Sequence, residues 1–234
     1  MSRILVIEDD EDINRLLCRI LKKEGYEVTS AYSGTEAKLR LEQEVPDLIL
    51  LDLMLPGMKG EEITEYIRNE RKSNVPIIIL SAKTAMENKV ELITMGADDY
   101  ITKPFEPQEV LLRVMAALRR AGMTESGKQG NEKTPEREFT YKNLSLNSVS
   151  RRVTVKEKEI SLTPHEYEIL FILLQQPQKV FSRDTLYETV WNNGYFGEDN
   201  TVNVHVSNIR KKIAAIDKEE EYIKTVWGIG FKMA

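Results

Sequence analysis

The sequence predicts two domains: a doubly wound α/β domain with a five-stranded parallel sheet, followed by an α+β domain with a helix-turn-helix and a β wing. Its 234 residues are 41% hydrophobic and 30% charged, which is long for one small domain and too apolar for a disordered chain. Strand and helix patterns alternate up to residue 121, whereas helices and a final hairpin dominate from residue 137. Residues 122–136 between them are polar and contain three glycines, so we expect a flexible linker there.

Five strand-then-helix units fill residues 1–121. Each strand is a short apolar run, and each helix repeats apolar residues at a spacing of three or four. The predicted pairs are Ile4–Ile7 with Ile13–Lys23, Glu27–Ala31 with Gly34–Glu44, Leu48–Leu51 with Glu61–Asn69, Ile77–Leu80 with Glu87–Met95, and Tyr100–Ile101 with Glu106–Arg120. This alternation predicts a parallel sheet that carries helices on both faces.

The elements after the linker follow a different order. A strand-like segment, Arg152–Val155, comes before three helical patterns and a hairpin. The expected helices are Pro164–Gln175, Arg183–Trp191 and Thr201–Ala215, and the expected hairpin is Tyr222–Met233. On the third helix, one apolar stripe should face the core, and it consists of Val202, Val206, Ile209 and Ile213. Three helices that end in a hairpin indicate a helix-turn-helix with a wing. His165, at the start of the first helix, is expected at the surface.

Net charge and cysteine content narrow the class of protein. The net charge of -5 belongs to residues 1–121, whereas residues 137–234 carry 14 basic and 13 acidic residues, so the acidic whole does not exclude a nucleic-acid partner. The single cysteine, Cys18, excludes an internal disulfide framework and a cysteine-rich zinc site. No apolar run approaches the ~20 residues that span a bilayer. The apolar run Ile4–Ile7 near the start is followed at once by acidic residues, so it is too short for the apolar region of a signal peptide. We expect a cytoplasmic protein without a membrane partner.

Charged and hydroxyl residues follow four of the five predicted strands. Glu8 and Asp9 follow the first strand, Asp52 the third, Ser81 the fourth and Lys103 the fifth. Ligands of open parallel sheets bind at the carboxyl ends of the strands, so these side chains should converge. Crowded carboxylates are tolerated when a divalent cation neutralises them, and Mg²⁺ prefers carboxylate, water and phosphate oxygens. The pattern predicts a Mg²⁺ site with phosphoryl transfer onto or near an aspartate.

Four motifs together resemble those of a response-regulator receiver, and the whole chain resembles the OmpR/PhoB type. The motifs are Ile7–Asp10, Leu51–Met58, Leu80–Ala82 and Gly96–Phe105. The resemblance implies a flavodoxin-like receiver over residues 1–121, a linker over 122–136 and a winged helix-turn-helix DNA-binding domain over 137–234. It also implies a two-component response regulator that a sensor histidine kinase phosphorylates, that dimerises on phosphorylation, and that binds double-stranded promoter DNA to regulate transcription.

The resemblance gives a role to each acidic residue of the predicted site. Asp52 is expected to be the phospho-acceptor. Mg²⁺ is expected to be bound by Asp52, by Asp9 directly, by Glu8 through water and by the main-chain carbonyl of Met54. Asp10 is not expected to be a ligand, because alternation along a strand points it away from Asp9.

The remaining receiver residues are expected to bind or sense the phosphoryl group. Lys103 would pair with its oxygens, and Ser81 and Tyr100 would form a switch pair that responds to it. The bond between Lys103 and Pro104 is expected to be cis. These roles describe a protein that is not a turnover enzyme, although slow self-dephosphorylation is compatible with them.

Two other functions remain as alternatives to this interpretation. Haloacid-dehalogenase phosphatases also use an aspartate nucleophile, but with a second aspartate two positions later, where this chain has Met54. That difference argues against a phosphatase. The other alternative is a receiver whose second domain binds protein instead of DNA.

The family dimerises through helix four, strand five and helix five, and this chain has charged residues at the matching positions. The implied pairs are Lys89 with Glu109, Asp99 with Arg113, and Asp98 with Arg120. Glu109 and Arg113 are four residues apart on one predicted helix, so pairing on their own helix is an alternative.

The third helix of the second domain is the expected recognition helix. By resemblance, the residues that face base edges are Thr201, Val204 and Asn208, and those that meet phosphates are Arg183, His205, Arg210, Lys211 and Lys212. Trp227 stands where many relatives have an arginine at the wing tip, and packing of its ring against the wing base is an open alternative. The loop Asn192–Asp199 is expected either to contact RNA polymerase or to support DNA binding.

Overall fold

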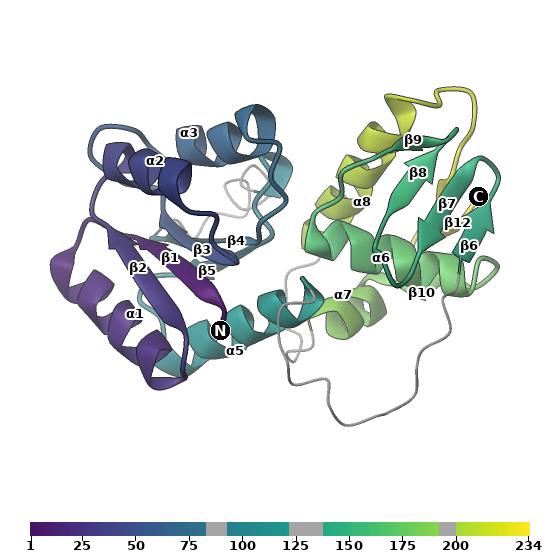
Figure 1. The fold of residues 1–234 in the computed structure, drawn as a ribbon. Coiled ribbons are helices and arrows are strands. Elements are labelled where there is room, and N and C mark those ends of the chain that lie inside the picture. The colour runs from purple at the N-terminus through teal and green to yellow at the C-terminus, as the bar shows by residue number, and fades with distance from the viewer. Residues whose placement is uncertain (83–92, 122–137, 192–199) are drawn as a thin grey trace. The chain divides into compact units, whose positions relative to one another are not determined.

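The computed structural model describes residues 1–82, 93–121, 138–191 and 200–234. The chain divides into two compact units, Met1–Glu125 and Ser126–Ala234, and each is considered by itself (Figure 1). The predicted linker, residues 192–199 and most of the predicted helix Glu87–Met95 lie outside the described residues. Among the helices that are described, none combines the length and the apolar composition needed to cross a membrane.

The first unit is a five-stranded parallel sheet between helices (Figure 1). Its strands are β1 (Arg3–Ile7), β2 (Glu27–Ala31), β3 (Leu48–Asp52), β4 (Ile77–Ser81) and β5 (Asp99–Thr102), in the order β2-β1-β3-β4-β5. Its described helices are α1 (Glu11–Lys23), α2 (Gly34–Gln43), α3 (Gly60–Glu65) and α5 (Pro107–Arg120), and a π-helical segment η1 (Tyr66–Glu70) follows α3. The predicted doubly wound fold is confirmed.

Alternate residues of the strands enter two hydrophobic cores. Ile4 and Val6 pack in the core that α1 and α5 cover, whereas Leu5 and Ile7 pack in the core under α2 and α3. Successive strand residues point to opposite faces, so a sheet covered on both sides needs apolar residues throughout. The central strands β3 and β4 are buried over their whole length for this reason. The strand order places the ends of β1 and β3 side by side, which is where a doubly wound sheet forms its ligand crevice.

The second unit joins two antiparallel sheets to three helices. The first sheet contains β6 (Glu138–Tyr141), β7 (Leu144–Asn147), β8 (Val153–Val155) and β9 (Lys158–Glu159). The helices are α6 (Pro164–Gln175), α7 (Arg183–Trp191) and α8 (Asn200–Ala214). The second sheet contains β10 (Phe181–Ser182), β11 (Ile223–Val226) and β12 (Gly230–Met233), with β12 in the middle. The last two strands form the predicted hairpin, and the unit is the predicted helix-turn-helix with a wing.

The core of the second unit uses the apolar stripe of α8. Val202, Val206 and their stripe partners are buried against α6 and α7, as predicted. The prediction for His165 is wrong, because this side chain is fully buried. Its ring centroid lies 4.5 Å from that of Trp191 and 5.6 Å from that of His205. The flat imidazole fills the junction of the three helices, which a pattern along one helix does not reveal.

Candidate functional site

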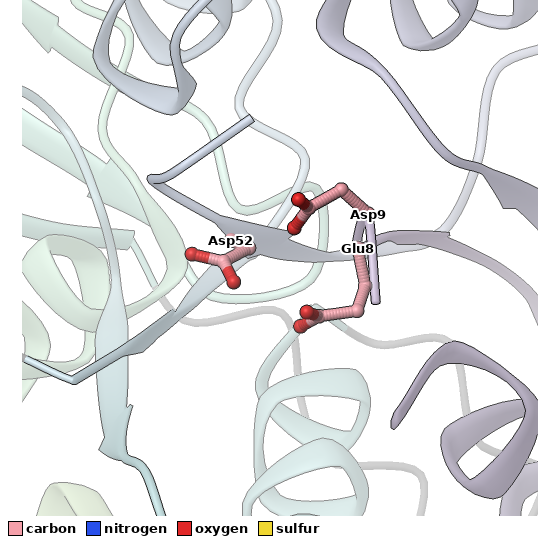
Figure 2. A group of neighbouring side chains, drawn as sticks. All are labelled: Glu8, Asp9 and Asp52. Carbon is pink, nitrogen blue, oxygen red and sulfur yellow. The ribbon is translucent and has the colours of Figure 1, made fainter. Parts of the chain in front are cut away.

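Three carboxylates meet at the carboxyl ends of β1 and β3 (Figure 2). Glu8 and Asp9 follow β1 directly, and Asp52 is the last residue of β3. Each offers an oxygen, and these oxygens all lie within 4.8 Å of one another. Glu8 and Asp52 are buried, whereas Asp9 is exposed and gives the cluster access to solvent. The residues predicted to converge at this edge of the sheet do so.

Lys103 reaches the same cluster from the end of β5. Its Nζ lies 2.8 and 2.6 Å from the two carboxylate oxygens of Glu8, and it also donates to Asp52 Oδ2. Its main-chain N–H donates to the carbonyl oxygen of Ser81 over 2.8 Å, so strand pairing continues to the site. The following Lys103–Pro104 peptide bond is cis, as predicted. One ammonium group thus binds two of the three acids.

Burial and crowding change the ionisation of the cluster. Burial raises the pKa of Glu8 from its ordinary value of 4.5 to about 7; the bond from Lys103 opposes this rise, and the charge of Asp52 adds to it. Burial by itself lowers the pKa of Lys103, but the bonds to Asp52 and Glu8 outweigh it, and the net direction is upward. The lysine is therefore charged at neutral pH, and this one ammonium group stands against three carboxyl groups.

Glu8→Gln should stabilise the first unit at pH 8 when divalent cations are removed by a chelator. The folded pKa of Glu8 lies above its unfolded value, so folding favours the protonated form, and stability falls as the pH rises from about 4.5 to about 7. The amide does not ionise, so the gain in Tm should be largest at pH 8 and shrink toward pH 5. Glu11→Gln, at an exposed acid of α1, is the control. A gain that does not depend on pH would contradict this explanation.

The loop after β3 holds Asp52 in place. The main-chain N–H of Met54 donates to Asp52 Oδ1 over 2.9 Å, so both carboxylate oxygens have a donor. Gly60 packs on the carbonyl oxygen of Asp52, which a Cβ at this position would approach to 2.5 Å. Asp10, in contrast, caps α1, since its Oδ1 accepts from the N–H groups of Asp12 and Ile13. Its use as a helix cap agrees with its exclusion from the cluster.

The predicted switch pair lies on neighbouring strands. Ser81 ends β4 and is 4% exposed, and Tyr100 lies on β5, where it packs partly buried against the core under α2 and α3. Strand pairing aligns Ser81 with Thr102, one residue before Lys103. Ser81 and Lys103 therefore line the same edge of the sheet as the carboxylates.

Two protein-family descriptions match successive parts of the chain. The response regulator receiver domain matches residues 4–115, and the C-terminal domain of transcriptional regulatory proteins matches residues 157–233. The transcriptional regulatory protein ResD of Bacillus subtilis is 42% identical over 233 residues, which cover 99% of this chain and 95% of ResD. This chain is an OmpR/PhoB-type response regulator.

Other relatives span the whole response regulator as well. The transcriptional regulatory protein SrrA of Staphylococcus aureus is 40% identical over 99% of this chain and 95% of its own length. A solved structure of a RitR mutant matches with a TM-score of 0.75 and 29% identity, and DrrB of Thermotoga maritima, an OmpR/PhoB homolog, matches with a TM-score of 0.51 and 30% identity. Each covers 100% of this chain and 99% of its own. The protein is a two-component response regulator that acts on transcription, and its two domains imply a kinase partner and DNA binding.

Charged residues predicted for a dimer surface are paired within the receiver. Arg113 Nη1 lies 2.8 and 3.0 Å from the carboxylate oxygens of Asp99. Its Nε and Nη2 lie 3.1 and 3.0 Å from Glu109 Oε1. In the single chain, Glu109 and Arg113 therefore pair on their own helix, as the alternative predicts. Lys89, the other predicted partner of Glu109, lies outside the described residues.

Asp98 is held inside the receiver. It is fully buried, and its Oδ2 accepts from Arg68 Nη2 over 2.8 Å and from the N–H of Ile77 over 2.9 Å. Arg120, its predicted partner across a dimer, is also buried in the single chain, at 5% exposure. The sequence pattern does not reveal Arg68, because an arginine near a helix end gives no signal that its side chain is only 10% exposed and paired with a buried acid. Its guanidinium also donates to the carbonyls of Gly96, Ser73 and Val75.

The recognition helix α8 of the DNA-binding domain exposes fewer of the predicted contacts than expected. His205 is 1% exposed and stacks in the core, so its predicted phosphate contact is wrong for this conformation. Thr201 and Val204 are also buried, which removes two predicted base contacts from the surface. Asn208 is partly exposed and Lys211 is exposed, so these two predicted residues remain accessible to DNA.

Three predicted phosphate-binding cations have partners inside the domain. Lys212 Nζ lies 2.6 Å from Oε2 of the buried Glu166, the residue that also caps the start of α6. Arg210 Nη2 donates to the carbonyl of Ile223 over 2.7 Å and to Thr225 Oγ1 over 2.9 Å. The third cation, Arg183, donates from Nε to Asn203 Oδ1 over 2.9 Å. These bonds join α8 to α6, α7 and the wing, so these residues position the helix.

The wing tip exposes Trp227. Its side chain is 89% exposed, so the alternative that it packs against the wing base is wrong. Gly228 follows with a φ of 75°, which glycine adopts without strain. The loop Asn192–Asp199, which is predicted either to contact RNA polymerase or to support DNA binding, lies outside the described residues.

Proposed function

We propose that Asp52 accepts a phosphoryl group from a sensor histidine kinase. The observation that carries this proposal is the cluster of three carboxylates within 4.8 Å, with Lys103 bound to two of them. The phosphorus would form a bond to a carboxylate oxygen of Asp52 as its bond to the kinase imidazole breaks. Lys103 and Ser81 lie at the same edge and would donate to the new phosphoryl oxygens.

The cluster suits Mg²⁺. Crowded, partly buried carboxylate oxygens favour a hard divalent cation. A bound cation would offset the burial and the charge of Asp52, which raise the pKa of Glu8. Asp9, Asp52 and the Met54 carbonyl would bind the ion directly, and Glu8 would do so through water. The ion, when bound, would neutralise the charge that develops on the transferred group.

Phosphorylation is proposed to shift the receiver toward a dimer. The phosphoryl group would bind Ser81 and draw Tyr100 inward, so that the modified site favours one of two conformations. The α5 surface offers apolar contacts as well as charge, because Leu112 and Met115 are about half exposed. Arg113 and Asp99 would exchange their partner within the chain for the same pair across the interface. Lys89 with Glu109 and Asp98 with Arg120 would form the other two pairs.

Two DNA-binding domains would then bind adjacent half-sites in promoter DNA. Because dimerisation links the two domains, binding of the second domain becomes effectively intramolecular once the first is bound. This raises the affinity for DNA without new contacts. Asn208 would contact a base edge and Lys211 a phosphate, and residues 122–136 would act as the flexible linker. A cytoplasmic location, an RNA polymerase contact and slow self-dephosphorylation complete the proposal.

A small phosphoryl donor tests the acceptor directly. Incubation of the full chain with phosphoramidate and Mg²⁺ should add one phosphoryl group per chain, measured by intact-protein mass spectrometry. Asp52→Asn should take up none, because an amide forms no acyl phosphate. Uptake by Asp52→Asn that equals uptake by the wild type would place the acceptor elsewhere.

A further inference from the structure

The tip of the wing is a compact, apolar projection. The last pair of the β11–β12 hairpin is Val226 with Gly230, and the turn is closed by the N–H of Ile229 donating to the Val226 carbonyl over 3.0 Å. The turn leaves Trp227 89% exposed and Ile229 56% exposed. The other tryptophan of the chain, Trp191, is 1% exposed. An indole with this exposure adds almost nothing to the core and is available to a partner.

The wing that carries this projection is fixed to the recognition helix. Arg210 of α8 donates to the carbonyl of Ile223 and to the hydroxyl of Thr225, both on β11. On the other side, Gly230 packs so closely on β10 that a Cβ would lie 1.9 Å from the Phe181 carbonyl oxygen. A wing tip that is held in one geometry loses little conformational freedom when it binds a partner. Because Arg210 links them, the wing tip and α8 would approach one surface together.

The charges of the hairpin point to a polyanion. Lys224 and Lys232 are directly opposite each other on β11 and β12, and Tyr222–Met233 contains no acidic residue. Like charges that face each other across strands destabilise a sheet, and phosphate groups placed beside them would remove this cost. A duplex offers phosphates beside apolar sugar and base surfaces, and apolar side chains enter the minor groove between base steps in several classes of DNA-binding protein.

We propose that Trp227 and Ile229 of the wing tip form an apolar wedge for the minor groove of the DNA that α8 contacts, and that Lys224 and Lys232 bind the flanking phosphates. The proposal rests on the DNA binding proposed above and adds a specificity determinant to it. A wedge opens a base step, and pyrimidine–purine steps open most easily. Trp227 therefore selects sequence through DNA deformability, without hydrogen bonds to base edges.

The test uses the full-length protein and duplexes that it selects from a random DNA library. Trp227→Ala should bind the selected duplex about tenfold more weakly, the scale of one aromatic contact to a base. The slope of log Kd against log salt should not change, because the indole neutralises no phosphate. Lys224→Ala with Lys232→Ala should instead lower that slope by about 2. Val149→Ala, at a 62% exposed apolar residue of the same domain, is the control and should bind like the wild type.

Tryptophan fluorescence gives a readout that a structural role would not move. The selected duplex should protect the wild type from acrylamide quenching, and Trp227→Phe should remove the protected signal, because Trp191 is buried. A second selection with Trp227→Ala should lose the pyrimidine–purine step at the wing position. The wedge would be overturned, with DNA binding left intact, if Trp227→Ala had the affinity or the base-step preference of the wild type. Protection from quenching that appears when the protein is concentrated without DNA would overturn it as well. If the wild type selects no duplex, the proposed DNA binding fails, and the wedge fails with it.

Discussion

Asp52→Asn should remain monomeric under conditions in which the wild type dimerises. Beryllofluoride with Mg²⁺ forms a stable mimic of an acyl phosphate on an aspartate, and the carboxamide lacks the charged oxygen that this complex needs. Sedimentation velocity of the full chain should show a shift to dimer for the wild type and none for the variant. The expected loss is complete, because the phosphoryl group supplies the interaction that distinguishes the two states.

Asp10→Asn is the matched control for this measurement. Asp10 belongs to the same acidic run as Asp9, but its carboxylate caps α1 through the N–H groups of Asp12 and Ile13. Asparagine caps helices as well as aspartate does, so the fold should be preserved. Asp10→Asn should dimerise like the wild type. A monomeric wild type with the mimic bound, or a dimeric Asp52→Asn, would contradict the proposed control by Asp52.

Arg68→Ala should strongly destabilise the receiver. Asp98 is fully buried, and its carboxylate is bound by Arg68 over 2.8 Å. Breaking a buried ion pair by removing one partner typically costs about 3 to 5 kcal/mol, because the other charge stays in a poorly solvating environment. The loss of the carbonyl contacts of Arg68 adds to this. Urea unfolding of the receiver followed by circular dichroism would measure the change in the free energy of unfolding.

Two further variants separate the ion pair from a general effect of losing an arginine. Arg119→Ala removes an exposed arginine of α5 and should change stability by less than about 0.5 kcal/mol. Combining Arg68→Ala with Asp98→Asn should recover part of the loss, because the uncompensated charge is also removed. If Arg68→Ala and Arg119→Ala lowered the free energy of unfolding equally, the buried ion pair of Arg68 with Asp98 would not explain the loss.

The receiver fold and its acidic site could be predicted because their signals are local. Buried parallel strands require continuous apolar runs, and β3 and β4 have them. Residues directly after such strands must meet at one edge, and this rule alone places Glu8, Asp52 and Lys103 together. Most of the first sheet of the DNA-binding domain was missed, since β6, β7 and β9 are four residues or shorter and partly exposed.

The sequence pattern does not show which of the predicted contact residues a distant element covers. The helical pattern of α8 separates its faces correctly, but it does not show that His205 is covered by Trp191 and His165. In the same way, spacing does not show that Asp98 faces Arg68, thirty residues earlier in the chain. The sequence does not decide the exposure of Trp227 either, because a large ring suits packing and recognition equally well.

Genome-wide DNA capture with the wild type and with Asp52→Ala tests most directly the claim that phosphorylation of Asp52 controls DNA binding. Cells would express each protein at the same level, under a condition that activates the kinase. The wild type should occupy a set of promoters that Asp52→Ala loses. Equal occupancy of the same promoters by the two proteins would contradict the claim.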